Sequence, residues 1–235
     1  MTAKDSSGGT TPHDGTLVDG PVWLRPPGGG GGALQSNGAG QQVALGNIFQ
    51  DGYQELSIAC WVKHEQSGWE NIVERSAWDN PDGIGLLMDY NTTSVSFGHY
   101  GSVAAQSKTR VQDGRWHHVA GTLAADGTNY VYSIYVDGKL DNTATGTVGL
   151  TATANGWAIG ARYDGTWPYH GLVADVRLYD CALTAAQVQA IYQEQNSAAL
   201  PTTPATGQGP LGDLPAAWGP GRAHFYGPSA GSGGF

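Results

Sequence analysis

The carboxylates Glu70 and Glu74 come closest in this sequence to a pair that could hydrolyse a glycoside. That reaction needs two carboxyl groups about 5–9.5 Å apart, one to protonate the leaving oxygen and one to act as nucleophile or base. Four residues along an extended strand separate two side chains by roughly 13 Å. The spacing is therefore too long, and we interpret the pair as a solvated stripe on the surface of a strand.

His117 and His118 form the other conspicuous pair of titratable side chains. Consecutive side chains on a strand point to opposite faces, so these two imidazoles cannot build one site. The sequence contains no His-Glu-x-x-His motif, nucleophile elbow, phosphate-binding loop or Cys-x-x-Cys motif. We predict that the chain is not an enzyme.

Aromatic side chains in two turn-rich stretches are the candidates for ligand contacts. Trp78 lies in the first stretch, and Tyr163, Trp167 and Tyr169 lie in the second. Exposed Trp and Tyr rings offer flat apolar faces with polar tips, which suit stacking on sugar rings or anchoring a protein partner. The alternative is that these rings fold back and cap the protein's own core.

The composition indicates which elements must position these side chains. The 235 residues include Gly 37, Pro 12, Trp 8 and Tyr 11, and only 13% are charged, which is typical of many short strands joined by tight turns. The formal net charge of −9 and the lack of a basic cluster argue against binding to nucleic acid, because its phosphates would be repelled. We find no apolar run near the roughly 20 residues that span a bilayer and no secretory signal peptide.

Three zones of different composition predict the domain organisation. Residues 1–20 are small and polar and are expected to form an N-terminal arm. Residues 21–195 hold nearly all of the strand-like pattern and are expected to form one β-sandwich. Residues 196–235 are rich in Pro, Gly and Ala and are expected to form a tail or linker.

Alternation of apolar and polar residues predicts the strands of the central zone. One face of the segment 55–64 carries Leu56, Ile58, Cys60 and Val62, and one face of the segment 171–180 carries Leu172, Ala174, Val176 and Leu178. Asp137-Gly138 is a strong signal for a type I′ hairpin. Further strands are predicted near residues 70–76, 84–90, 94–99, 116–123, 129–136 and 157–162.

A single short helix is predicted near the end of the central zone. Thr184 and Gln187 match a capping box, and Val188, Ile191 and Tyr192 form an apolar stripe. We expect this helix to cover one end of the sandwich.

Several runs resemble LamG-like jelly-roll domains of the laminin-G, pentraxin and concanavalin A-like lectin superfamily. Together they cover roughly residues 15–193 in the order typical of the family. The runs are Gly31–Leu34, Val43–Gly46, Leu56–Lys63, Trp116–Ala120, Tyr135–Lys139, Gly171–Tyr179 and Ala182–Val188. The resemblance implies an all-β fold with two curved antiparallel sheets face to face. Cys60 and Cys181 can be free thiols or, if the closing strand lies beside Leu56–Lys63, a disulfide.

The family's first strand is the point at which the chain departs from the pattern. LamG-like domains usually have a strand before the loop that Asp5–Gly8 matches, but only four residues precede that loop here. An exposed sheet edge invites pairing. We expect the tail, around Ala223–Tyr226, or a segment of another chain to fill the gap by strand addition; the alternative is a shorter sheet with its edge covered by loops.

The resemblance to pentraxins also implies a calcium site. Asp79 and Asn80 stand where pentraxins carry an Asp-Asn pair, and Asp164 stands at a matching acidic position. Arg162 occupies a position where pentraxins have an acidic ligand, so at most one calcium ion is expected. The alternative is that these are ordinary turn residues.

The fold and the missing catalytic motifs predict a binding or structural module. Our first hypothesis is a surface component of a large assembly, such as a capsid decoration or tail-associated protein of a phage virion, that contacts other subunits and host glycans. The second is a free lectin-like carbohydrate-binding domain, and the third an ancillary domain of a carbohydrate-active enzyme. The expected location is a virion surface or the extracellular space.

Overall fold

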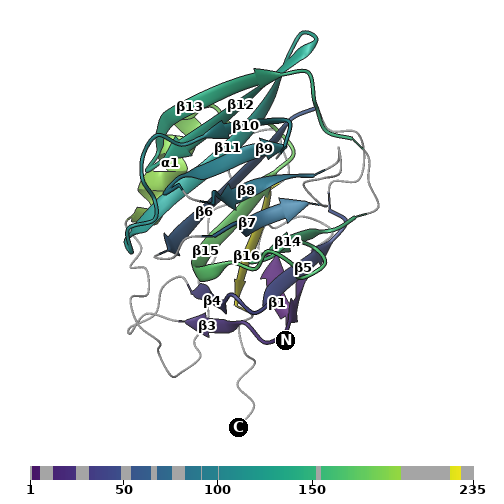
Figure 1. Ribbon diagram of the computed structural model, residues 1–235, viewed down its shortest axis with the longest axis vertical. Helices are drawn as coiled ribbons and strands as arrows, with labels where there is room; N and C mark the ends of the chain where they lie inside the picture. The colour runs from purple at the N-terminus through teal and green to yellow at the C-terminus, as the bar shows by residue number, and fades with distance from the viewer. Residues whose placement is uncertain are drawn as a thin grey trace.

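The described part of the chain folds into short antiparallel strands joined by turns, with one helix, as its composition predicts (Figure 1). The structure is a computed structural model. It describes residues 2–5, 13–24, 32–48, 54–64, 68–75, 83–90, 92–99, 101–151, 155–196 and 223–228, and at 195–196 and 223–228 it describes the backbone.

The front sheet carries the strands on which the candidate site is built. In hydrogen-bonded order it consists of β10 (Val103–Gln106), β9 (Val95–His99), β8 (Ile84–Met88), β7 (Glu70–Arg75), β14 (Trp157–Ile159), β5 (Gln42–Gly46) and β2 (Gly15–Val18). Strands distant in sequence are neighbours here, since β14 lies between β7 and β5.

The back sheet packs behind the front sheet. It consists of β15 (His170–Tyr179), β6 (Leu56–His64), β11 (Trp116–Asp126), β12 (Asn129–Val136) and β13 (Lys139–Gly146), and β4 (Ala33–Asn37) and β3 (Val22–Leu24) extend it beside the first half of β15. The turn between β12 and β13 is the predicted type I′ hairpin, because both Asp137 (φ 50°) and Gly138 (φ 75°) have positive φ. The predicted antiparallel jelly-roll sandwich is confirmed.

Two terminal strands connect the sheets along one edge. β1 (Thr2–Asp5) pairs with β2, and β16 (Ala223–Pro228) lies between β1 and β15 (Figure 1, purple and yellow). Tyr226 is opposite both Asp5 and Val176. The expectation that the tail supplies a strand is therefore confirmed, whereas a missing first strand was wrong, since four residues suffice for a short β1. The predicted boundary at residue 20 is also corrected, because β1 and β2 belong to the sheet.

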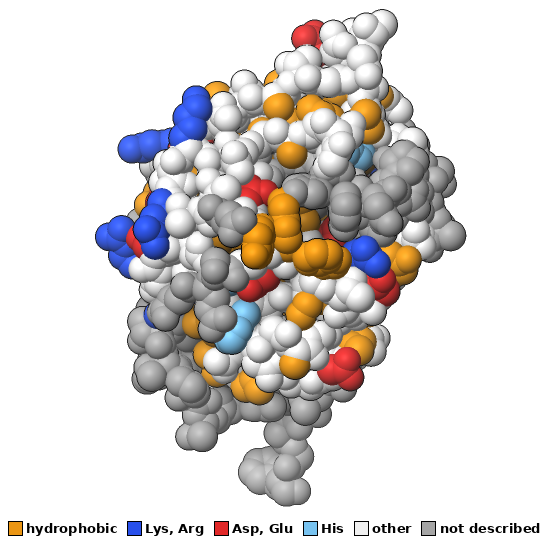
Figure 2. All heavy atoms as spheres, in the orientation of Figure 1, with side chains coloured by type: hydrophobic (Ala, Val, Ile, Leu, Met, Phe, Trp, Pro, Cys, Tyr) orange, Lys and Arg blue, Asp and Glu red, His pale blue; other side chains and the backbone are white. Residues whose placement is uncertain are grey.

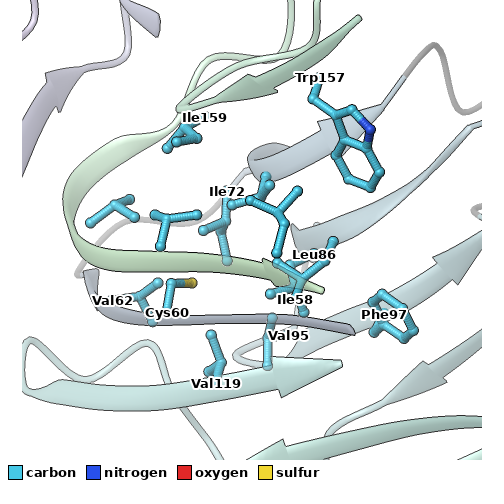
Figure 3. Packing of buried hydrophobic residues seen from close by; sticks show 14 of the residues in the cluster. Ile58, Cys60, Val62, Ile72, Leu86, Val95, Phe97, Val119, Trp157 and Ile159 are labelled. Carbon is cyan, nitrogen blue, oxygen red and sulfur yellow. The ribbon is translucent and has the colours of Figure 1, made fainter. Parts of the chain in front are cut away.

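The core lies between the two sheets and is formed by their inward-facing residues. Ile58, Cys60 and Val62 of β6 point inward beside Ile72, Leu86 and Phe97 of the front sheet (Figure 3). Each fully buried side chain of this kind contributes roughly 1.5–3 kcal/mol. The predicted inward face of the segment 55–64 is confirmed, and both cysteines are free thiols.

The alternation predicted for the segment 171–180 was wrong, because β15 contains a bulge. Its register shifts between Ala174 and Arg177, and Asp175 has a φ of 46°. Leu172 and Ala174 therefore pack on the outer side with Trp61, while Val176 and Leu178 join the core. An extra residue in one strand reverses which face the following side chains occupy.

The predicted helix is α1 (Ala185–Asn196), and its capping box is confirmed. The Gln187 side chain accepts the backbone N–H of Thr184 at 2.8 Å, and the Thr184 hydroxyl accepts that of Gln187 at 3.3 Å. The helix does not cover an end of the sandwich as expected. Its Val188 and Ile191 pack on the outer face of the back sheet, where Ala59 and Ala120 leave room for it.

Candidate functional site

The segment between β14 and β15 holds the second predicted group of aromatics and is fastened to β7. The Gly160 N–H donates to the Ile72 carbonyl at 2.9 Å, and the Asn71 N–H donates to the Trp167 carbonyl at 3.0 Å. The Tyr169 N–H closes the segment by donating to the Gly160 carbonyl at 2.8 Å. These bonds place the loop at the start of β7 and hold its backbone in one conformation.

Trp167 combines exposure with an unfavourable backbone conformation. Its side chain is 40% exposed, and its φ is 51°. Bulky residues avoid this left-handed region, which costs roughly 1–3 kcal/mol and is usually retained where function requires it. Tyr163 of the same loop is 38% exposed. Both rings are accessible, as the binding hypothesis requires.

Two further aromatics stand next to this loop and were not predicted as site residues. Trp69, two residues before Asn71, stacks on Tyr90 with ring centroids 6.2 Å apart and planes 15° apart. Tyr90 is exposed and lies just after β8. Sequence spacing gives no signal for this pair, since 20 residues separate its members and only the pairing of β7 with β8 brings them together. We call Trp69, Tyr90, Tyr163 and Trp167 the aromatic rim.

Hydrophobic side chains gather near the centre of the face shown in Figure 2, in the region that β7, β8 and β14 occupy in Figure 1. A Lys or Arg side chain and acidic side chains lie beside them. Apolar surface with a few charged groups at its border is typical of ligand-contact surfaces.

Tyr169, predicted to contact ligand, is fully buried, and that prediction is corrected. Its ring stacks on His64 with centroids 5.0 Å apart, and its hydroxyl donates to the Lys63 carbonyl at 3.4 Å. Burial raises the pKa of this phenol well above its usual value. Tyr169 caps the protein's own core, which was the alternative for the aromatic group. Trp78, the other predicted aromatic, lies outside the described residues, as do Asp79 and Asn80.

Asp164, the remaining predicted calcium ligand, is engaged by donors of its own loop. Oδ1 accepts the Arg162 Nε–H at 3.0 Å and the Thr166 hydroxyl at 2.6 Å, and Oδ2 accepts the second Arg162 nitrogen at 2.5 Å. These bonds, that of Arg162 foremost, hold the pKa of Asp164 well below its usual range. As it stands, this carboxylate does not fit a calcium ligand, because a cation already neutralises it. Among the described residues, no group of three or more His, Cys, Asp or Glu could hold a metal ion.

Glu70 and Glu74 are both buried, so the prediction of a solvated stripe was wrong. The register of β7 shifts between Asn71 and Val73. Glu70 is therefore opposite Met88, which faces the core, whereas Glu74 is opposite Gly85, which lies on the outer face of β8 between the core residues Ile84 and Leu86. The two carboxylates therefore point to opposite faces of the sheet. Glu74 accepts a hydrogen bond from the Asn71 amide at 2.5 Å, and they do not form a catalytic pair.

Glu70 lies beside His64 at the end of the segment between β14 and β15, which we call the rim loop. Glu70 Oε2 is 3.5 Å from His64 Nε2 and accepts the His170 N–H at 2.8 Å. Burial raises the pKa of Glu70 to about 7, and the hydrogen bond from His170 opposes that shift. A buried carboxyl group with a raised pKa that binds the end of a loop carrying exposed aromatics makes this anchor sensitive to pH.

His117 and His118 occupy separate environments, as predicted. His117 contacts Asp137 through Nδ1 at 2.9 Å and Asp113 through Nε2 at 3.1 Å, and the Asp137 hydrogen bond foremost raises its pKa. His118 is fully buried beside Trp61, and burial lowers its pKa to about 3. Neither lies on the aromatic rim.

Known proteins resemble this chain over most of its length. A curated rat protein (Rattus norvegicus), the sushi, von Willebrand factor type A, EGF and pentraxin domain-containing protein 1, is 27% identical over 146 residues; the match covers 58% of this chain and 4% of that much longer protein. Domain 4 of AbnA, a GH43 extracellular arabinanase from Geobacillus stearothermophilus solved in complex with arabinotriose, is 21% identical with a TM-score of 0.61, covering 82% of this chain and 100% of that one. The Trypanosoma rangeli sialidase is 19% identical with a TM-score of 0.57, covering 83% and 32%.

These structural likenesses show the fold. No helix in the described part of the chain is long and apolar enough to cross a membrane. The sequence profile of the laminin G-like family, described as the concanavalin A-like lectin/glucanases superfamily, matches residues 37–189, which is more than half of the chain. The chain belongs to this family.

Proposed function

We propose that this chain is a carbohydrate-binding module that holds a saccharide against the aromatic rim. The observation that carries the proposal is Trp167, an exposed indole kept at a φ of 51°. A glycine would occupy this backbone conformation without strain, so packing alone gives no reason for a tryptophan here. Stacking on a sugar ring supplies that reason.

The surroundings of Trp167 support a saccharide rather than an anionic polymer. The stacked Trp69–Tyr90 pair adds flat apolar surface, and the Arg162 guanidinium, in the same loop as Trp167, is paired with Asp164. The net charge of −9 further disfavours polyanions. The similar arabinanase domain was solved with arabinotriose, which makes neutral oligosaccharides the first probes.

The test is a screen of the protein against neutral and sialylated oligosaccharides, followed by calorimetry on the best binder. We expect Trp167→Gly to abolish measurable binding while its unfolding temperature stays equal or rises, because glycine relieves the backbone strain. Leu140→Ala, which removes a similarly exposed apolar side chain on β13, is the matched control and should bind like the parent. Unchanged affinity in Trp167→Gly would refute the proposal.

The other roles considered for this chain stay predictions. A surface component of a phage virion would need contacts with other subunits, and the strand β16, one candidate for such contacts, pairs within its own chain. An ancillary domain of a carbohydrate-active enzyme and an extracellular location are both compatible with the module proposed here. Immunoprecipitation of the protein together with its bound neighbours distinguishes these settings.

A further inference from the structure

His170, the first residue of β15, connects the aromatic rim to two titratable side chains. Its N–H donates to Glu70 Oε2 at 2.8 Å, and its carbonyl is 2.8 Å from His64 Nδ1. The rim loop ends at this residue, three positions after Trp167. Glu70 on β7 and His64 on β6 therefore hold the end of the loop through the two backbone polar groups of one residue.

The hydrogen bonds define where protons must be. A carbonyl only accepts, so His64 Nδ1 carries a proton. The other ring nitrogen, Nε2, faces Glu70 Oε2 at 3.5 Å, and both side chains are nearly inaccessible to water. A bare nitrogen opposite an ionised carboxylate is repulsive in such a place. The observed contact is favourable when the pair holds one proton at these atoms, either on His64 Nε2 or on Glu70 Oε2.

Two neighbouring groups in the described part of the chain, the Tyr169 phenol and the Cys60 thiol, do not titrate in the same range. The Tyr169 phenol stacks on His64 and lies close to Glu70, and the Cys60 thiol lies near Tyr169. Burial raises the pKa of both, so they stay neutral at neutral pH. On the other side β8 presents the uncharged Met88 opposite Glu70. The half-buried imidazole of His170 also belongs to this region and needs its own control.

We propose that Glu70 and His64 form a proton-dependent clamp on His170 that positions Trp167, so that saccharide binding at the rim weakens when the pair loses its shared proton. This inference rests on the function proposed above and adds its regulation. Glu70 and His64 are positioning residues, since they act on the ligand through the loop.

The direction of the pH dependence follows from the raised pKa of the Glu70 carboxyl group. The pKa of Glu70 rises in the folded protein from 4.5 to about 7. The protonated pair therefore stabilises the clamp fully below pH 4.5, and this contribution is lost as the pH rises through about 7. Binding should be tight at mildly acidic pH and weaker at mildly alkaline pH.

The first experiment follows the Trp167 indole N–H by NMR in the free protein between pH 5.5 and 8.5, with Trp167→Gly to assign the signal. In the parent protein we expect the signal to titrate with a midpoint near that of Glu70. Glu70→Gln should flatten the curve, because the amide accepts from His170 and donates to His64 without titrating. His64→Gln keeps the buried carboxyl of Glu70 and should move the midpoint of the curve without flattening it, which gives a second reading of the pair if Glu70→Gln folds poorly.

The second experiment measures affinity for the best oligosaccharide of the screen over the same pH range. We expect about a fivefold loss from low to high pH in the parent, typical of a modest coupling between sites, and no loss in Glu70→Gln. His170→Gln tests the third imidazole and His117→Gln a remote one, and both should keep the parental curve. An unchanged pH dependence in Glu70→Gln would overturn the clamp. If the indole signal titrates but no saccharide binds, the proposed function fails and the clamp stands.

Discussion

Gly121 of β11 lies directly beneath the ring of Phe97 of β9, so that a Cβ atom at residue 121 would stand 2.1 Å from Phe97 Cγ. The two residues belong to opposite sheets, and Phe97 also approaches Tyr132 of β12 with ring centroids 6.3 Å apart. Glycine at this position is therefore a requirement for close packing between the sheets.

Replacing Gly121 by alanine should lower the free energy of unfolding by about 1–3 kcal/mol, because the added methyl group overlaps Phe97 in a packed core. Urea unfolding measures the loss. Gly127→Ala is the matched control: its neighbourhood is open and its φ is 62°, so it reports backbone strain without a clash. In a Phe97→Leu background the Gly121→Ala cost should shrink, and an equal cost in both backgrounds would show that Phe97 is not the obstacle.

His117 should make stability depend on pH at mildly alkaline values. Asp137 and Asp113 raise its pKa above 6.5 in the folded state. A raised pKa stabilises the fold fully below pH 6.5, and this contribution disappears as the pH rises through the folded value. Urea unfolding of the parent protein and of His117→Gln should therefore differ most at pH 6 and least at pH 9. A difference that stays constant over this range would contradict the assignment.

Removal of β16 should expose two sheet edges. A chain ending at Asn196 leaves the backbones of Asp5 in β1 and Val176 in β15 without the partner that Tyr226 provides. Unpaired edges invite pairing with other chains. We expect a lower unfolding temperature and a larger average mass by light scattering than for the full chain.

Tyr226→Pro in the full chain is the companion variant for β16. Proline removes one backbone donor and is poorly tolerated inside a sheet, so it should produce the same change without shortening the protein. A truncated chain with the stability and mass of the parent would show that β16 does not close this edge.

Calcium should bind Asp164 only after its guanidinium partner is removed. Arg162 supplies two of the hydrogen bonds to this carboxylate. We expect millimolar calcium to raise the unfolding temperature of Arg162→Ala more than that of the parent. Arg162→Ala combined with Asp164→Asn should lose the gain. Equal calcium shifts in all three proteins would place any ion elsewhere.

The local patterns of the sequence predicted the elements that neighbouring residues control. The capping box of α1, the Asp137-Gly138 turn and the inward face of β6 depend on contacts within a few residues, so the residue types suffice to predict them. The two-sheet architecture was predicted differently, from the resemblance of the ordered runs to the family. A strand around Ala223–Tyr226 was one of the predicted ways to cover an open sheet edge, beside a segment of another chain or covering loops, and the structure has it as β16.

Only the tertiary structure determined the facing of side chains and the composition of the site. The register shifts in β7 and β15 reversed the faces of Glu74 and Val176, and alternation alone does not show where an extra residue enters a strand. Tyr169 and Trp167 are both aromatics of one loop, yet one is buried and the other exposed because the loop is hydrogen bonded to β7. Pairing between strands brings together the side chains around the loop, namely Trp69, Tyr90, Glu70 and His64. The spacing of residues along the sequence does not encode this pairing.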